Sequence, residues 1–244
     1  MIIKLAKRII GIKNIHPYIE EYCKDYIVKD DSKSDLTVVI SKEDIDYERE
    51  KSRKEDITEG RVVIDYSDDY LETLAAYRKI AEWLPIVDTI LFHGSVISMD
   101  GKGYLFTAKS GAGKSTHARL WRELYGDRVV MINDDKPLIH VSEEDVRAYG
   151  TPWDGKHRLS TNTSVPLAGI CVLHRSKDNR IERVSGKEVY PMFVQQTYRP
   201  SQKESMLKTF DLLDRILEKV PVYDLYCNMA PEAARIAYEG MNRD

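Results

Sequence analysis

The sequence predicts an α/β protein in which strands and helices alternate through the larger, C-terminal part of the chain. Apolar runs rich in β-branched or aromatic residues recur between residues 89 and 226, and amphipathic helical patterns lie between several of them. A glycine-rich segment joins one such run to the next helix. With 42% hydrophobic and 32% charged positions among 244 residues, the composition is that of a folded globular protein.

Residues 1–66 are assigned to a small, β-rich N-terminal lobe whose function the sequence does not indicate. Two runs rich in β-branched residues, Leu36–Ile40 and Arg61–Asp65, are predicted to be strands. Between them, residues 41–59 carry 13 charged side chains in 19 positions. This composition favours either a solvated loop or an exposed helix, and we assign no chemistry to it.

Residues 67–244 are assigned to a second, larger domain. Its first helix follows Ser67, a favourable N-cap, and ends before Pro85, and we expect this helix to join the two lobes. A turn at residues 100–103 predicts a hairpin within residues 93–107. The other patterns predict strands at residues 89–92, 103–107, 128–132, 168–173 and 220–226, and helices at residues 115–125, 203–219 and 231–241.

Charge and cysteine content exclude several classes of protein. The chain has 37 Lys and Arg against 40 Asp and Glu, so no strong field attracts nucleic acid or an anionic membrane. Three widely spaced cysteines, Cys23, Cys171 and Cys227, indicate reduced thiols rather than a disulfide framework or a zinc site. Basic residues interrupt the apolar N-terminal stretch, and no segment reaches about 18 apolar residues, so we predict a cytoplasmic protein.

Residues 108–115 follow the phosphate-loop pattern G-x-x-x-x-G-K-[ST], with alanine in place of the first glycine. Gly111 and Gly113 are expected to let backbone N–H groups converge on phosphates at a helix N-terminus. Lys114 is expected to reach the β- and γ-phosphates, and Ser115 to bind Mg²⁺. An ordinary glycine-rich turn is the alternative, but the flanking strand and helix favour ATP and Mg²⁺ as cofactors. The predicted nucleotide-binding residues are Ser110, Gly111, Ala112, Gly113, Lys114, Ser115 and Thr116.

Two acidic residues, Asp134 and Asp135, follow the next predicted strand. The helix between the two strands is long enough for a crossover connection, so the strand ends are expected to lie close together. Ligands of open α/β sheets gather at the carboxyl ends of strands, which places the acids opposite Lys114. One carboxylate would bind Mg²⁺ while the other accepts a proton from an attacking hydroxyl. The alternative is an ordinary turn.

These features together resemble the catalytic domain of HPr kinase/phosphorylase, within the phosphoenolpyruvate carboxykinase-like group of nucleotide-binding folds. The resemblance rests on His93-Gly94, on residues 110–115 and on Asp134-Asp135, and its specific part spans about residues 90–138. It implies a core like the C-terminal domain of HPr kinase, with Asp134 as the proton acceptor and Asp135 as a metal-site carboxylate. It also implies that His93 lies near the phosphates, although a lone histidine at a strand end is also a common structural residue.

One departure from that family concerns the substrate. The glycine-rich segment that follows the acid pair in HPr kinases has no clear counterpart here, and residues 149–158 stand in its place. This segment either contacts substrate or transition-state charge through Lys156 and Arg158, or is a surface loop held by Trp153. Arg199 is a candidate phosphate clamp, with a solvated arginine as the alternative.

The leading hypothesis is an ATP-dependent kinase that transfers a phosphoryl group to a hydroxyl, such as a serine of a protein or peptide. The alternative is a nucleotide-gated module that binds a peptide or protein with little or no turnover. Phosphoenolpyruvate carboxykinase activity is a weaker third hypothesis, because those enzymes are far longer. The sequence does not identify the acceptor, so a protein, a peptide and a small molecule all stay open. A homo-oligomer also stays open, and no nucleic-acid or membrane partner is expected.

Overall fold

The computed structural model describes residues 1–29, 33–109, 111–155 and 157–243, and the chain divides into two compact units, Met1–Trp83 and Leu84–Asp244. The sequence predicts a boundary after Tyr66. In the structure, the helix α3 (Asp68–Trp83) has the predicted bounds but belongs to the first unit. Within the described ranges, no helix combines the length and the apolar composition that a membrane crossing requires.

The first unit combines a three-stranded sheet with helices. Its strands are β1 (Ile2–Leu5), β2 (Arg8–Lys13) and β3 (Leu36–Val39), in the spatial order β1-β2-β3. The helices are α1 (Tyr18–Tyr22) and α2 (Lys42–Thr58), besides α3, with a short 3-10 turn at Lys24–Tyr26. The charged segment 41–59 is therefore the helix α2, and the unit holds more helix than strand, in contrast to the β-rich lobe expected.

The strand predicted at residues 61–65 is wrong. These residues have no strand partner, and Val62 is 85% exposed. The Ile64 N–H donates to the Asp56 carboxylate at 3.2 Å rather than to a neighbouring strand. β-branched residues favour a strand only where the pleated surface is covered, and here no such surface forms.

The Asp44 carboxylate ties α2 to α3. It accepts hydrogen bonds from the Ser41 backbone at the start of α2, and it pairs with Arg78 at 3.1 Å and Lys79 at 2.5 Å on α3. Burial raises the pKa of Asp44, but the hydrogen bonds from Lys79, Ser41 and Arg78 outweigh it and lower the pKa to about 2. The stabilisation is therefore complete above pH 3.8, the ordinary value, and is lost as the pH falls toward 2.

We expect Asp44→Asn to lower the free energy of unfolding of the full chain by about 1–3 kcal/mol at pH 7. The loss should shrink as the pH falls toward 2, because the native carboxylate is then protonated as well. Urea unfolding at both pH values measures the effect, with Asp46→Asn, an exposed position on the same helix, as the control. An equal loss at the two pH values would contradict an ionic contribution.

The second unit is built on a mixed sheet. Its order is β4-β8-β9-β10-β6-β5-β7, with β12 against β10 and β11 against β12. The pairs β6–β10 and β10–β12 are parallel, and the others are antiparallel. The strands are β4 (Thr89–Leu91), β5 (Ser95–Met99), β6 (Lys102–Thr107), β7 (Val129–Asn133), β8 (Leu138–Val141), β9 (Val146–Tyr149), β10 (Ser164–Arg175), β11 (Arg180–Val184) and β12 (Val222–Cys227).

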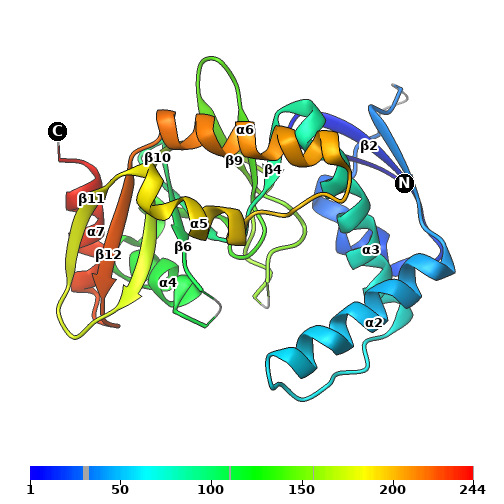
Figure 1. Cartoon of the computed structure of the whole chain (residues 1–244), viewed down its shortest axis with the longest axis horizontal. Helices are drawn as coiled ribbons and strands as arrows, with labels where there is room; N and C mark the ends of the chain where they lie inside the picture. The colour runs from blue at the N-terminus through cyan, green and yellow to red at the C-terminus, as the bar shows by residue number, and fades with distance from the viewer. Residues whose placement is uncertain (30–32, 110, 156, 244) are drawn as a thin grey trace. The chain divides into compact units, whose positions relative to one another are not determined.

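Helices cover both faces of this sheet (Figure 1). Along β6, Tyr104 and Phe106 point to the face that carries Trp121, with ring centroids 5.0 and 5.6 Å from that of Trp121. Leu105, between them, belongs to the core on the other face. This period of two is that of a strand buried on both sides. The predicted α/β class is therefore confirmed. One face carries α4 (Lys114–Tyr125) and α7 (Glu232–Met241), and the other carries α5 (Gly186–Gln196) and α6 (Lys203–Lys219).

The predicted hairpin is confirmed as β5 and β6, but its place in the sheet differs from the expected crossover. Strand β5 pairs with both β6 and β7, so the two strands that flank α4 are not neighbours. They still run in the same direction, since β5 is antiparallel to each. Their carboxyl ends, Thr107 and Asn133, therefore share an edge of the sheet with Ser95, the first residue of β5.

Candidate functional site

The glycine-rich loop, residues 108–113, leaves β6 and enters α4. Gly111 has φ of +74° and Gly113 has φ of +112°, a backbone conformation that side chains disfavour. A Cβ at either position would meet no atom of the described residues within 4 Å, and both glycines line an open cavity of about 480 Å³. The first N–H groups of α4 have no partner within the helix and are available to a ligand. Ser110, one of the predicted binding residues, lies outside the described residues.

Lys114, the first residue of α4, is only 8% exposed. Its ammonium group donates to the Ala108 carbonyl at 3.4 Å, and in the described ranges it forms no salt bridge. Burial lowers the pKa of Lys114, and the nearby carboxylates of Asp135 and Asp134 oppose this shift. The structure thus brings the lysine and both acids together without pairing them directly.

Asp134 connects two elements of the site. One carboxylate oxygen accepts a hydrogen bond from the Ser95 hydroxyl at 2.7 Å, and Ser115 in the first turn of α4 lies close enough to lower the pKa of the same carboxylate. Burial raises the pKa of Asp134, the two serines lower it, and the charge of Asp135 raises it further. With 8% exposure, this carboxylate is shielded from most solvent.

Asp135 lies beside His93. Its carboxylate is 3.4 Å from His93 Nε2 and 3.3 Å from the Lys136 ammonium. Burial lowers the pKa of His93, Lys114 lowers it further and Asp135 opposes the shift, so the imidazole is neutral at pH 7. The His93 backbone donates to the Gln196 carbonyl at 2.7 Å, which anchors the histidine between β4 and β5.

Asn133 holds the acid pair in place, and the sequence analysis did not single it out. Its side-chain oxygen accepts the N–H groups of Asp135 at 2.9 Å and Lys136 at 2.6 Å. Its amide donates to Thr151 and to the Trp153 carbonyl, at 3.0 to 3.4 Å. An asparagine side chain that accepts the N–H of the residue two positions on forms an Asx turn. The sequence signal for this turn was the asparagine that follows the predicted strand.

The segment that follows β9 packs against the acid pair. Trp153 is buried, as the packing alternative predicts, and a Cβ added to Gly155 would lie 3.5 Å from the Cβ of Asp135. Arg158 pairs with the buried Asp154 at 3.4 Å, and Lys156 lies outside the described residues. The segment is thus part of the wall of the site rather than a detached surface loop.

Two separate cavities lie at the N-terminal part of α4, and Thr116 lines both. The loop cavity, of about 480 Å³, is lined by Gly111, Ala112, Gly113, Thr116, His117, Leu120, Arg175, Ser176, Cys227, Asn228 and Met229. The acid cavity, of about 350 Å³, is lined by Ser115, Thr116, Arg119, Arg122, Asp134, His157 and Leu159. Arg199, the candidate phosphate clamp, is exposed and lines neither cavity.

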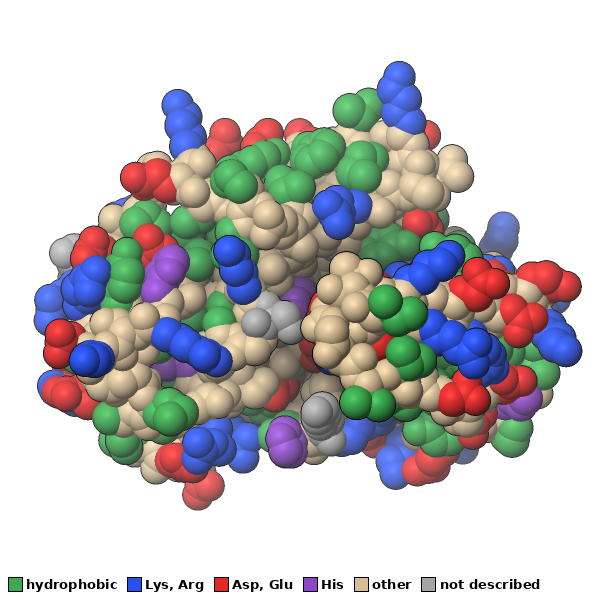
Figure 2. Space-filling view, turned by 60° about the horizontal axis from the view of Figure 1, so that its bottom comes forward, with side chains coloured by type: hydrophobic (Ala, Val, Ile, Leu, Met, Phe, Trp, Pro, Cys, Tyr) green, Lys and Arg blue, Asp and Glu red, His purple; other side chains and the backbone are tan. Residues whose placement is uncertain are grey.

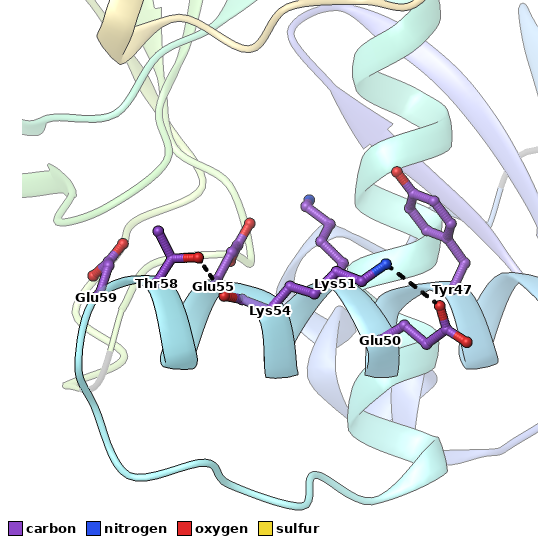
Figure 3. Close-up of a pocket in the computed structure, with 7 residues that line it drawn as sticks. All are labelled: Tyr47, Glu50, Lys51, Lys54, Glu55, Thr58 and Glu59. Carbon is purple, nitrogen blue, oxygen red and sulfur yellow. Dashed lines mark hydrogen bonds and ion pairs between the residues drawn. The ribbon is translucent and has the colours of Figure 1, made fainter.

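The first unit has a cavity of its own, of about 310 Å³, along α2 (Figure 3). Its two lysines pair along the helix, Lys54 with Glu50 at 3.7 Å and Lys51 with Glu48 at 3.8 Å. The lining residues come from α2 and its C-cap, Glu59, so this is a solvated helix face and we assign no ligand to it. They are Tyr47, Glu50, Lys51, Lys54, Glu55, Thr58 and Glu59.

No protein-family model matches this chain, and no curated protein matches it either. Among solved structures, the Hpr(Ser) kinase/phosphatase from Coxiella burnetii is similar to it with a TM-score of 0.37 and 8% sequence identity. That similarity covers 62% of this chain and 95% of the other. Similarity at this level does not establish a family, and we therefore base the functional proposal on the residues of the site.

Proposed function

We propose that this chain is an ATP-dependent kinase that transfers the γ-phosphoryl group to a hydroxyl acceptor. In this proposal the second unit is a phosphate-loop core like that of HPr kinase/phosphorylase and phosphoenolpyruvate carboxykinase. Residues 110–116 bind the phosphates, and Mg²⁺ is bound beside them.

The observation that carries the proposal is that Lys114 is buried without a salt bridge to any described residue. A buried ammonium group is costly unless an anion or several hydrogen bonds compensate it. Here the described residues offer one carbonyl at 3.4 Å and no salt bridge, while the neighbouring glycine loop is open. A polyphosphate bound to the loop N–H groups would supply the missing anion.

The residues also fit a magnesium ion held mainly by the nucleotide. Within the part of the chain that the structure describes, no group of three or more His, Cys, Asp and Glu side chains is placed to hold a metal. Mg²⁺ usually keeps several waters and takes one or two protein oxygens besides those of phosphate. Ser115 and Asp135 are the proposed protein ligands.

Phosphoryl transfer then consists of two bond changes in the substrates and one proton transfer to the chain. The new bond joins the acceptor oxygen to the γ-phosphorus, the bond to the bridging oxygen of ADP breaks, and the hydroxyl proton passes to Asp134. Lys114 stabilises charge on the phosphates, and neutral His93 keeps Asp135 oriented. The loop cavity is assigned to the nucleoside, and the acid cavity, which contains Asp134, to the acceptor.

The direct test is binding of Mg²⁺ and a non-hydrolysable ATP analogue by isothermal titration calorimetry. We expect Lys114→Ala to weaken binding about 10- to 100-fold, the value of one or two charge-assisted hydrogen bonds. Lys187→Ala, at an exposed position of α5, is the matched control and should bind as the native chain does. Equal affinity in all three proteins would rule out the proposed nucleotide site.

Activity needs a second measurement, because binding alone does not show transfer. Incubation with γ-labelled ATP and a lysate of the source cell should label an acceptor, and Lys114→Ala should abolish that label. Nucleotide binding without label above this variant would instead support a nucleotide-gated module that binds a peptide or protein.

A further inference from the structure

We propose that the phosphate acceptor carries an anionic group, a carboxylate or a phosphate, and that Arg119 and Arg122 in the acid cavity bind it. The inference rests on the proposed function, since it takes Asp134 as the group that receives the hydroxyl proton. It adds the chemical class of the acceptor, which the phosphate loop itself does not determine.

The two arginines lie on the same face of α4 as Ser115. Their positions follow Ser115 by four and seven residues, which is the spacing of one helical stripe. At about 1.5 Å of rise per residue, they stand about 6 and 10 Å farther along the helix axis. All three residues line the acid cavity together with Asp134. An acceptor with its hydroxyl at Asp134 therefore extends toward the arginines.

The charges in the acid cavity are unbalanced. Among the described residues that line it, Asp134 is the one acid, against the two arginines Arg119 and Arg122. Arg119 pairs with Glu123 at 2.6 Å, but half-buried Arg122 has no ion pair within the described ranges. Elsewhere, acidic and basic side chains are interspersed on the face shown in Figure 2. An anionic group on the ligand would complete the charge balance of this cavity.

The acceptor thus carries both a hydroxyl and a carboxylate or phosphate on the same molecule. Two sources supply it: a free hydroxy acid or phosphorylated alcohol, and a serine peptide with acidic neighbours. A cavity of about 350 Å³ accommodates a small molecule or a side chain with part of its backbone. Guanidinium groups bind both kinds of oxyanion in the same bidentate manner.

The first experiment measures binding of inorganic phosphate to the full chain by ³¹P NMR, with Mg²⁺ and a saturating non-hydrolysable ATP analogue. The analogue fills the phosphate loop, so a further phosphate must bind elsewhere. We expect the double variant Arg119→Gln/Arg122→Gln to weaken this binding about tenfold or more. Arg235→Gln is the control, because Arg235 is an exposed arginine of α7 with acidic partners, as Arg119 is on α4.

The second experiment identifies the source by competition against bound phosphate. Glycerol 3-phosphate is compared with glycerol, and a serine peptide with two aspartates is compared with the same peptide carrying asparagines. Displacement by one charged member, but not by its neutral partner, supports the inference and names the source. Phosphate binding unchanged in the double variant, or no displacement by either charged probe, overturns it. Loss of analogue binding with arginine-dependent phosphate binding intact would count against the nucleotide site alone.

Discussion

Replacing Asp134 with asparagine is expected to lower the rate of phosphoryl transfer about 10²- to 10⁴-fold, because an amide cannot accept the hydroxyl proton. The substitution keeps the size of the side chain, and the amide oxygen can still accept the Ser95 hydrogen bond. Affinity for the Mg²⁺–ATP complex should stay that of the native chain. Single-turnover transfer from labelled ATP and calorimetric binding of the analogue measure the two quantities separately.

Asp135→Asn is the matched variant, and it distinguishes the roles of the two acids. Because Asp135 is proposed to bind Mg²⁺, its loss should raise the Mg²⁺ concentration needed for half-maximal transfer. Asp134 lines the same cavity as Ser115, the other proposed Mg²⁺ ligand, so the opposite assignment of the two acids is tested in the same assays. If Asp134→Asn raises the Mg²⁺ requirement while Asp135→Asn abolishes phosphoryl transfer at saturating Mg²⁺, the two roles are exchanged. Normal turnover of the Asp134→Asn variant would show that Asp134 is not the base that accepts the hydroxyl proton.

Asn133→Ala is expected to lower the free energy of unfolding by about 2–4 kcal/mol, since it removes the acceptor of two backbone N–H groups and a buried donor to two carbonyls. The N–H groups are those of Asp135 and Lys136, whereas the carbonyls of Thr151 and Trp153 each lose one of two donors and keep the hydroxyls of Ser160 and Thr151. Transfer activity should fall even where the protein stays folded, because the acid pair loses its orientation. Urea unfolding and transfer rates at saturating ATP measure the two effects.

Asn133→Asp separates the two halves of this network. A carboxylate accepts the two N–H groups that orient the acid pair, but it cannot donate to the carbonyls of the segment that follows β9. It also adds a third negative charge beside Asp134 and Asp135. We therefore expect stability and activity to stay reduced in this variant. Full recovery of both would show that the contacts to Thr151 and Trp153 contribute little.

The fold was predictable from the sequence where elements are long and amphipathic. The helices α4, α6 and α7 and the hairpin β5–β6 were predicted within a residue or two, because their apolar periods are clear. The short strands β8, β9 and β11 were not, since four or five residues carry little periodic signal. Arg61–Asp65 misled the prediction, because β-branched residues indicate a strand only where a partner exists.

The site divides in the same way. The glycine loop and the acid pair are contiguous motifs, so their residues were identified from the sequence, and the structure brings Lys114, Asp134, Asp135 and His93 together. Ser95, Arg119 and Arg122 belong to no contiguous motif, and only the folded chain shows that they reach the same space. Distances between elements depend on strand order, which local patterns do not encode.

That strand order has a geometric consequence for what the site can hold. Neighbouring strands stand about 4.8 Å apart, so the intervening β5 keeps the carboxyl ends of β6 and β7 about 10 Å from each other. If β6 and β7 were direct neighbours, their carboxyl ends would stand only about 4.8 Å apart. The reversed strand β5 thus separates the glycine loop from the acid pair, and its first residue, Ser95, ties its amino end to the Asp134 carboxylate by a hydrogen bond of 2.7 Å.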